Sequence, residues 1–242
     1  TYSPEGGIDN ECINAEGYYL LGVDQNLLLI KNIGYLFCLT HSLNISIVTL
    51  FQRCVGQLTK YNDKFRILLN GNITLYFASN QELISVIEYL EYAQLIPLKY
   101  IDIPWNDIFI SIGYYLFGVN TILFEDNQND LINLVLPQNL KTMEEMFPSS
   151  HKNLVVLRQV DKYYPIYLIN TDIFKKTGII ETRLFLNESG LITTIQAVVR
   201  KHLETNNSNQ ITSDIDMAVI KKFIKSNKKI HIVSYFINYS NL

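Results

Sequence analysis

Histidine and cysteine are the side chains that most often perform catalysis or bind transition metals, so they are weighed first in this 242-residue chain. The four histidines lie far apart and form no metal-binding pattern, which favours surface or loop roles for all of them (His41, His151, His202, His231). The three cysteines are widely spaced and include no Cys-x-x-Cys pair, so we expect no zinc site, no disulfide framework and a reducing compartment (Cys12, Cys38, Cys54). An enzyme of unrecognised type stays open, because spacing does not exclude a pair between one of the last two cysteines and His41 or His151.

Acidic side chains offer a second possible chemistry, because carboxylates are the usual ligands of Ca²⁺ and Mg²⁺. Glu125, Asp126 and Asp130 follow an apolar run of strand length, a place where metal-binding carboxylates can lie. Acidic, asparagine-rich turns are common for other reasons, and we expect no metal and no cofactor. The sequence also contains no P-loop, no GxGxxG and no GxSxG motif. It therefore predicts no working catalytic site, and we expect the chain not to be an enzyme.

Basic side chains near the end of the chain could contact the phosphates of a nucleic acid. The segment contains five lysines and is followed by aromatic residues (Lys221, Lys222, Lys225, Lys228, Lys229). The alternative is a solvated C-terminal end of a helix, where lysines suit the helix dipole. The formal net charge of −3 lacks the basic excess typical of a protein whose main task is to hold nucleic acid.

The elements that must position these residues alternate between helical and strand-like patterns. Helices are predicted where apolar residues recur at helical spacing or caps are present (about 26–38, 46–60, 79–92, 102–118, 142–147, 189–204, 212–226). Short apolar runs predict strands (120–125, 131–136, 153–158, 163–170, 229–239). Asn70-Gly71-Asn72 predicts a β-hairpin, or a turn between a helix and a strand. The expected fold class is mixed α/β (α+β), with helices packed on a central, mostly antiparallel sheet.

The domain organisation predicted from this pattern has three parts. Residues 1–16 are expected to be a linker, 17–187 one α/β domain, and 188–242 a small helical C-terminal part with a final strand. No apolar run reaches the roughly 20 residues that span a bilayer, and residues 1–16 do not resemble a signal peptide. We expect an excised part of a longer protein that does not enter a membrane.

Four stretches, taken in their order and distances, resemble a viral protein family. They are Gly22–Asn26, Leu69–Phe77, Gly118–Glu125 and Tyr163–Tyr167. Together they look like the central part of the large subunit of the early transcription factor of poxviruses and related nucleocytoplasmic large DNA viruses. The resemblance covers roughly residues 17–185, and Tyr164 stands where the family pattern has glutamate.

This resemblance implies a part in viral early transcription initiation. The implied partners are an ATPase small subunit, the viral RNA polymerase and promoter DNA. The implied location is the viral factory in the host cytoplasm, and the virion. No residue in the chain identifies itself as a reader of bases, so the chain is expected to contribute to promoter recognition or to assembly.

A second resemblance concerns the fold of the OTU family of papain-like cysteine proteases. In that family an Asp-x-x-Cys element begins the first helix, and a histidine begins a late strand. In this chain Asp24 is followed at the nucleophile position by Leu27, and Tyr163 stands in the histidine position. The groups that form and use a thiolate are absent from these positions, so the likeness implies a catalytically inactive, protein-binding domain.

Overall fold

The structure is a computed structural model, and it describes residues 17–20, 33–93, 95–127, 131–135, 142–159, 162–169, 177, 180 and 182–205. Its centre is a five-stranded sheet in the order β1-β5-β4-β2-β3. The strands are β1 (Gly17–Leu20), β2 (Val119–Asn127), β3 (Leu131–Val135), β4 (Lys152–Gln159) and β5 (Lys162–Ile169). The β2–β4 pair is parallel and the other three pairs are antiparallel, so the predicted α+β class with a mostly antiparallel sheet is confirmed.

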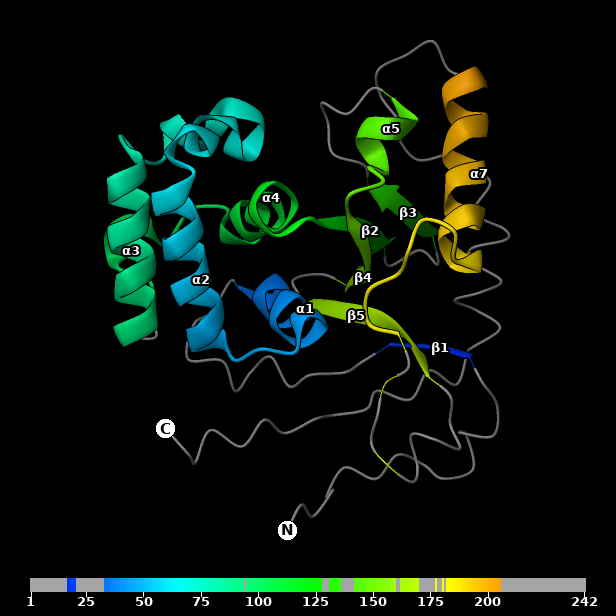
Figure 1. Ribbon diagram of the computed structural model, residues 1–242, viewed down its shortest axis with the longest axis horizontal. Helices are drawn as coiled ribbons and strands as arrows, with labels where there is room; N and C mark the ends of the chain where they lie inside the picture. The colour runs from blue at the N-terminus through cyan, green and yellow to red at the C-terminus, as the bar shows by residue number, and fades with distance from the viewer. Residues whose placement is uncertain are drawn as a thin grey trace.

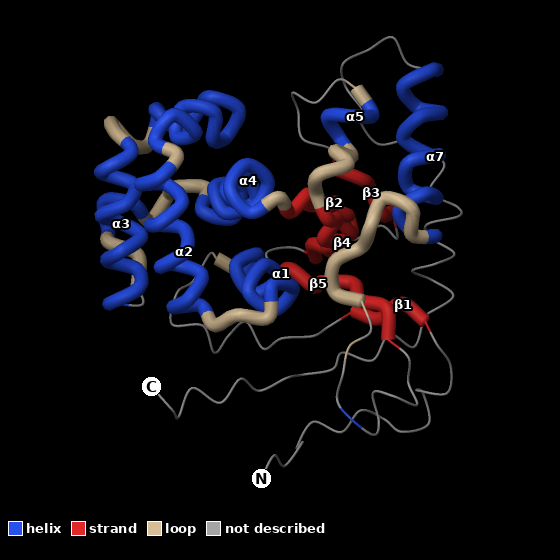
Figure 2. The backbone as a smooth tube through the Cα atoms, in the orientation of Figure 1, coloured by secondary structure: helices blue, strands red, loops and turns tan. Residues whose placement is uncertain are grey.

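Helices cover both faces of this sheet (Figure 1; Figure 2). On one face lie α1 (Gly34–Leu43) and α4 (Trp105–Phe117), and on the other lie α5 (Met143–Met146) and α7 (Gly190–Thr205). Beyond α1 and α4, away from the sheet, lie α2 (Ile47–Lys60) and α3 (Asn80–Ala93) with the 3₁₀ segments η2 (Asn62–Leu75) and η3 (Leu98–Tyr100). Within the described residues, no single helix is long and apolar enough to span a membrane; α1 and α2, bent by 89°, reach that length and composition only together.

Side chains of the central strands alternate between two hydrophobic cores. Val119 and Leu123 of β2 face α1 and α4, whereas Ile122 and Phe124 face α5 and α7. Helix α7 contributes its apolar side to the second core through Leu191, Ile192, Ile195 and Val199. The predicted linker and most of the predicted C-terminal part lie outside the described residues, so the division into three parts stays a prediction.

Several helix ends carry local capping interactions. Ser46 caps α2 by accepting the amide of Thr49, and Thr142 forms a capping box with Glu145 at α5. Gly118 ends α4 with a left-handed φ of 63°, which glycine adopts without a Cβ penalty. The helices predicted at 46–60, 79–92, 102–118, 142–147 and 189–204, and the four strands predicted between residues 120 and 170, are confirmed to within a few residues.

Three predictions near the N-terminal half are wrong. Residues 17–20 form an edge strand paired with β5, outside the sheet region that the sequence indicated. The first helix continues past Cys38 to Leu43, because Thr40 and Ser42 bond to backbone carbonyls three residues back and stay satisfied while buried. Asn70 and Gly71 form no hairpin; with Leu69 they adopt left-handed φ values between two 3₁₀ turns. The first helix also begins at Gly34 and not near residue 26. The predicted elements after residue 205 lie outside the described residues.

Three asparagines form a hydrogen-bonded chain inside the second core. Asn153 in β4 is fully buried; its Oδ1 accepts from Asn120 Nδ2 at 2.8 Å, and its Nδ2 donates to Asn187 Oδ1 at 2.7 Å. Asn120 also donates to the Met146 carbonyl, and Asn187 donates to the Phe147 carbonyl. The chain therefore joins β2, β4, α5 and the segment before α7 through satisfied polar groups.

We predict that Asn153→Ala lowers the free energy of unfolding by about 2–3 kcal/mol, because buried donors and acceptors lose their partners. The matched control is Asn72→Ala, at an exposed position in η2, which we expect to change the free energy by less than about 0.5 kcal/mol. Urea unfolding measures both values. Equal effects of the two substitutions would contradict a structural role for the asparagine chain.

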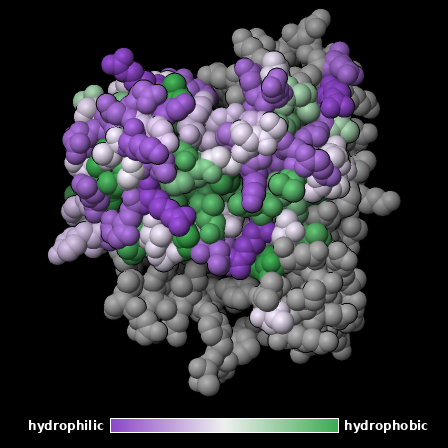
Figure 3. Space-filling view, in the orientation of Figure 1, coloured by the Kyte–Doolittle hydropathy of each residue, from purple (hydrophilic) through white to green (hydrophobic). Residues whose placement is uncertain are grey.

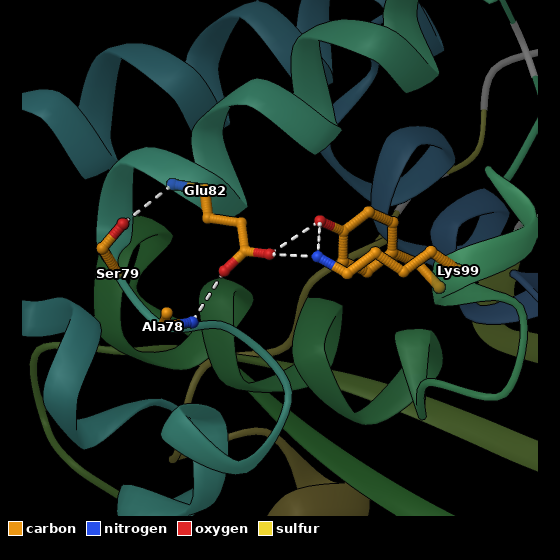
Figure 4. A network of polar contacts seen from close by, with 5 residues as sticks. Ala78, Ser79, Glu82 and Lys99 are labelled. Atoms are coloured by element: carbon orange, nitrogen blue, oxygen red, sulfur yellow. Dashed lines mark hydrogen bonds and ion pairs between the residues drawn. The ribbon is translucent and has the colours of Figure 1, made fainter.

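A polar network joins the start of α3 to the segment that follows it (Figure 4). The Ser79 hydroxyl accepts the amide of Glu82 at 3.2 Å, and Glu82 Oε2 accepts the amide of Ala78 at 2.7 Å. Glu82 Oε1 accepts from Lys99 Nζ at 2.9 Å and from the Tyr100 hydroxyl at 2.7 Å. The hydrogen bonds from Lys99, Tyr100 and Ala78 lower the pKa of Glu82 from 4.5 to about 2.

We predict that Glu82→Gln destabilises the chain by roughly 0.5–1 kcal/mol near neutral pH, and that this loss is pH-dependent. A carboxyl whose folded pKa is lowered stabilises fully above its unfolded pKa of about 4.5, and that stabilisation disappears as the pH falls toward 2. The control Ser79→Ala should cost about 1 kcal/mol at every pH, because serine does not titrate. Urea unfolding across this pH range separates the two, and a pH-independent loss for Glu82→Gln would refute the assignment.

Candidate functional site

The edge at which the parallel strands β2 and β4 end is the place in this fold to look for a ligand site. In α/β folds, ligands often bind beyond the carboxyl ends of parallel strands. The first turns of two helices lie near this edge. The Tyr35 amide in α1 donates to Asn106 Oδ1 in α4 at 2.9 Å, which holds the two helix N-termini together.

Arg158 is the centre of the charged groups at this edge. In the register of the sheet it lies between Glu125 of β2 and Tyr163 of β5. It forms an ion pair with Glu125 and a hydrogen bond with the Tyr163 hydroxyl. The three side chains therefore form a row across three strands, which we call the Arg158 row.

Burial controls the protonation of the groups around this row. It raises the pKa of the Asp107 carboxyl in the first turn of α4, and the charge of Arg158 partly opposes that effect. Burial also raises the pKa of Tyr163, and the hydrogen bond from Arg158 opposes it. The phenol therefore stays neutral near neutral pH, and Arg158, whose side chain is 34% exposed, bonds to both neighbours in the row. This arrangement fastens strand ends together and supplies no activated nucleophile.

Tyr163 also occupies the position that the OTU resemblance assigns to a histidine. It is 4% exposed and lies near the start of β5, where its ring meets the edge of the Tyr35 ring in the first turn of α1, with centroids 6.2 Å apart. The neighbouring polar contact is internal as well, because the Tyr35 hydroxyl and Thr121 Oγ1 lie 2.6 Å apart. Asp24 and Leu27, the other two positions of that resemblance, lie outside the described residues.

The two described cysteines are poor nucleophiles in this structure. Cys38 in α1 and Cys54 in α2 are both fully buried, and burial raises the pKa of each thiol. A raised pKa leaves the thiol protonated near neutral pH, and the thiolate is the reactive form. Burial therefore disfavours Cys38 and Cys54 as nucleophiles in the folded chain.

His41 differs from the expected surface or loop position, because it lies in α1 and is largely covered. Its ring stacks on Tyr167 with centroids 5.4 Å apart, and its Nδ1 lies 3.2 Å from the Tyr167 hydroxyl. Burial, assisted by the charge of Arg183, lowers the pKa of His41 to about 4. Arg183 donates to the His41 carbonyl and to Asn44 Oδ1, so it fastens the end of α1 to the segment after β5. His41 is therefore neutral near pH 7 and contributes to packing.

His151 lies in the loop before β4, as expected. Its Nε2 lies 2.9 Å from the Tyr114 carbonyl oxygen, and its Nδ1 lies 2.9 Å from Ser150 Oγ. His231 and the five lysines Lys221, Lys222, Lys225, Lys228 and Lys229 lie outside the described residues, and so does Asp130 of the acidic cluster. Within the described part of the chain, no group of three His, Cys, Asp or Glu side chains could hold a metal ion.

Sequence reasoning did not single out Arg158, Asp107 or Arg183. Arg158 and Glu125 each end an apolar run, which is a visible signal for a charge at a strand end. Their pairing could not be inferred, because the sequence does not show that β2 and β4 are neighbours. Arg183 acts on residues about 140 positions earlier in the chain, and no local pattern indicates that contact.

We predict that iodoacetamide labels Cys38 and Cys54 slowly near neutral pH, in a Cys12→Ser variant that removes the third thiol. Denaturing urea should accelerate the labelling by roughly a hundredfold, because unfolding exposes both thiols and restores their ordinary pKa. Mass spectrometry of digested samples reports each site separately. Rapid labelling of either thiol in the folded chain would reopen the hypothesis of a cysteine enzyme.

No protein-family model matches the sequence, and no solved structure matches the fold.

Proposed function

We propose that this chain is a non-catalytic interaction domain of a viral early transcription initiation factor. The non-catalytic part of the proposal is supported by the burial or internal bonding of the side chains that could react. Both described thiols are buried with raised pKa values, and the charged groups at the strand edge are bonded to one another. The domain assembles with an ATPase subunit and the viral RNA polymerase in the host cytoplasm and the virion.

The transcription part of the proposal is supported by the resemblance in four stretches. Of the three that are described, Gly118–Glu125 forms the end of α4 and most of β2, and Tyr163–Tyr167 lies in β5. Leu69–Phe77 contains the left-handed turn at Asn70 and Gly71, fixed by the Leu69 amide donating to Ser111 Oγ. Two of these stretches, Gly118–Glu125 and Tyr163–Tyr167, lie mostly in the core, whereas most of Leu69–Phe77 is exposed.

A second candidate is a catalytically inactive OTU-like domain that binds ubiquitin-like proteins. It is favoured by one observation, the position of Tyr163 near the start of β5 and beside the first turn of α1. A histidine there would face the start of α1 at Gly34, whereas Leu27, the nucleophile position of the resemblance, lies outside the described residues. Both candidates are interaction domains, and they differ in their partners.

We expect the intact chain to form a complex with the ATPase subunit or the polymerase in sedimentation velocity experiments, and none with ubiquitin. A complex with ubiquitin alone would favour the second candidate. The absence of every one of these complexes, together with no binding to DNA, would refute the transcription proposal.

Fluorescence anisotropy with an AT-rich promoter duplex and a scrambled duplex, across a salt series, tests the part played by DNA. We expect weak binding without preference between the duplexes, because the net charge is −3. Replacing the five C-terminal lysines with alanine should reduce the salt slope by about one unit for each lysine that contacts a phosphate. If the chain instead prefers the promoter duplex, and the lysine variant loses that preference, the lysines take part in promoter recognition.

A further inference from the structure

Helix α3 carries apolar side chains on the side that faces away from the protein. In Figure 1 it is the outermost helix of its layer, with α2 between it and the rest of the molecule. Tyr92 is 91% exposed and Tyr89 is 43% exposed, and the chain just beyond the helix adds Leu95 at 48% and Leu98 at 86%. We call these four residues the α3 outer surface. Figure 3 shows that apolar side chains interrupt the polar surface over this layer of helices.

The fold does not require these four side chains. The inner side of α3 supplies the buried residues Leu83, Ile87 and Leu90, which belong to the core that α2 shares. Tyr89 and Tyr92 are three positions apart and therefore lie together on the opposite side of the helix. Leu98 lies toward the first turn of α3, because its neighbour Lys99 bonds to Glu82 there, and Tyr92 lies in the last turn, so these exposed side chains are spread along the helix. Exposed apolar side chains without a structural reason indicate an interaction site.

The segment that presents Leu98 is fixed in place. Its neighbours Lys99 and Tyr100 both bond to Glu82 in the first turn of α3 (Figure 4). The Tyr100 ring also stacks on Phe77, with centroids 5.5 Å apart, and the Tyr100 carbonyl accepts the indole N–H of Trp105 at 2.9 Å. The segment that carries Leu98 is therefore already ordered, so little conformational entropy of this segment is lost when a partner binds.

The charge beside Tyr89 and Tyr92 is negative. Glu88 is exposed and lies four positions before Tyr92 on the same helix, and Glu91 accepts a hydrogen bond from the neutral Gln52. Within the described residues, neither glutamate forms an ion pair, whereas Glu82 is neutralised by Lys99. A partner that covers the apolar residues would therefore gain from Lys or Arg beside them.

We propose that the α3 outer surface binds a basic amphipathic helix of a partner protein. Aliphatic residues of that helix cover Tyr89, Tyr92 and Leu98, and its lysines or arginines meet Glu88 and Glu91. A stable dimer usually buries about 800 Å² on each partner, more than four side chains supply, so a helix fits better than a second copy of this chain. The inference rests on the proposed interaction function and names the chemistry of its partner.

The test uses the intact 242-residue chain and a fluorescent helical peptide of about 18 residues, built from leucine and lysine. A second peptide with glutamate in place of lysine has the same apolar side. We expect binding of the lysine peptide, and binding at least tenfold weaker for the glutamate peptide. The double variant Tyr92→Ala, Leu98→Ala and the single variant Glu88→Lys should each weaken the lysine peptide by about tenfold.

The matched control is Leu186→Ala, because Leu186 is 57% exposed and lies between β5 and α7, away from α3. It should leave peptide affinity unchanged within about twofold, and circular dichroism should show that all variants remain folded. No binding, equal binding of both peptides, or binding that the α3 variants do not weaken would overturn the proposal.

Sedimentation equilibrium of the chain alone tests whether a second copy of the chain, and not a partner helix, covers the α3 outer surface. A dimer that the double variant Tyr92→Ala, Leu98→Ala abolishes would overturn the partner helix in favour of a second copy. If the peptide test fails but the chain still forms its complexes with the ATPase subunit or the polymerase, the proposed binding surface is refuted and the proposed function stands. Loss of those complexes would refute the function itself.

Discussion

The parallel pairing of β2 with β4 is the constraint on which the rest of the fold depends. Every residue from Val119 to Phe124 and from Asn153 to Leu157 is buried, so both faces of the pair must be covered. A parallel pair also cannot be closed by a hairpin, and the chain passes through β3 and α5 before β4 begins. Helices on both sides of the sheet follow directly from this requirement.

Burial on both faces also decides where polar residues can lie. Asn120, Thr121 and Asn153 lie within the buried pair, and each side chain needs a hydrogen-bond partner. Thr121 forms a hydrogen bond with the Tyr35 hydroxyl in α1. Asn120 donates to the Met146 carbonyl in α5, and Asn153 donates to Asn187 in the segment before α7. The same groups that would be costly if unpaired therefore bind the layers on either side to the sheet.

The sequence predicted those parts of the fold that depend on neighbouring residues. Ser46, Thr142 and Gly118 mark helix ends through bonds or dihedral angles within a few positions, and the helices they bound are confirmed. The edge strand at 17–20 was not predicted, and the turn at residues 70–72 was predicted between the wrong elements, because distant residues decide both. Gly17–Leu20 pairs with β5 about 150 positions away, and the left-handed Leu69 is held by Ser111.

The candidate site was less predictable than the fold for the same reason. Arg158 obtains its role from β2 and β5, and strand order is not readable from apolar runs. The absence of catalytic motifs predicts a chain without a catalytic site, and this stays a prediction. The burial of Cys38 and Cys54 is a separate property that the sequence does not show. Burial depends on how α1 and α2 pack, which is a property of the whole domain.

These constraints separate the part of the molecule that builds the fold from the part that can bind. At the strand edge, Arg158 bonds to Glu125 and Tyr163, so the usual ligand position of an α/β sheet is used for structure. Helix α3 is reached from the sheet only across α1, α4 and α2, and its outer residues do not affect the packing of β2 and β4. Tyr92 and Leu98 can therefore stay exposed without cost to the core, and a layer with this freedom is where an interaction domain can place its partner surface.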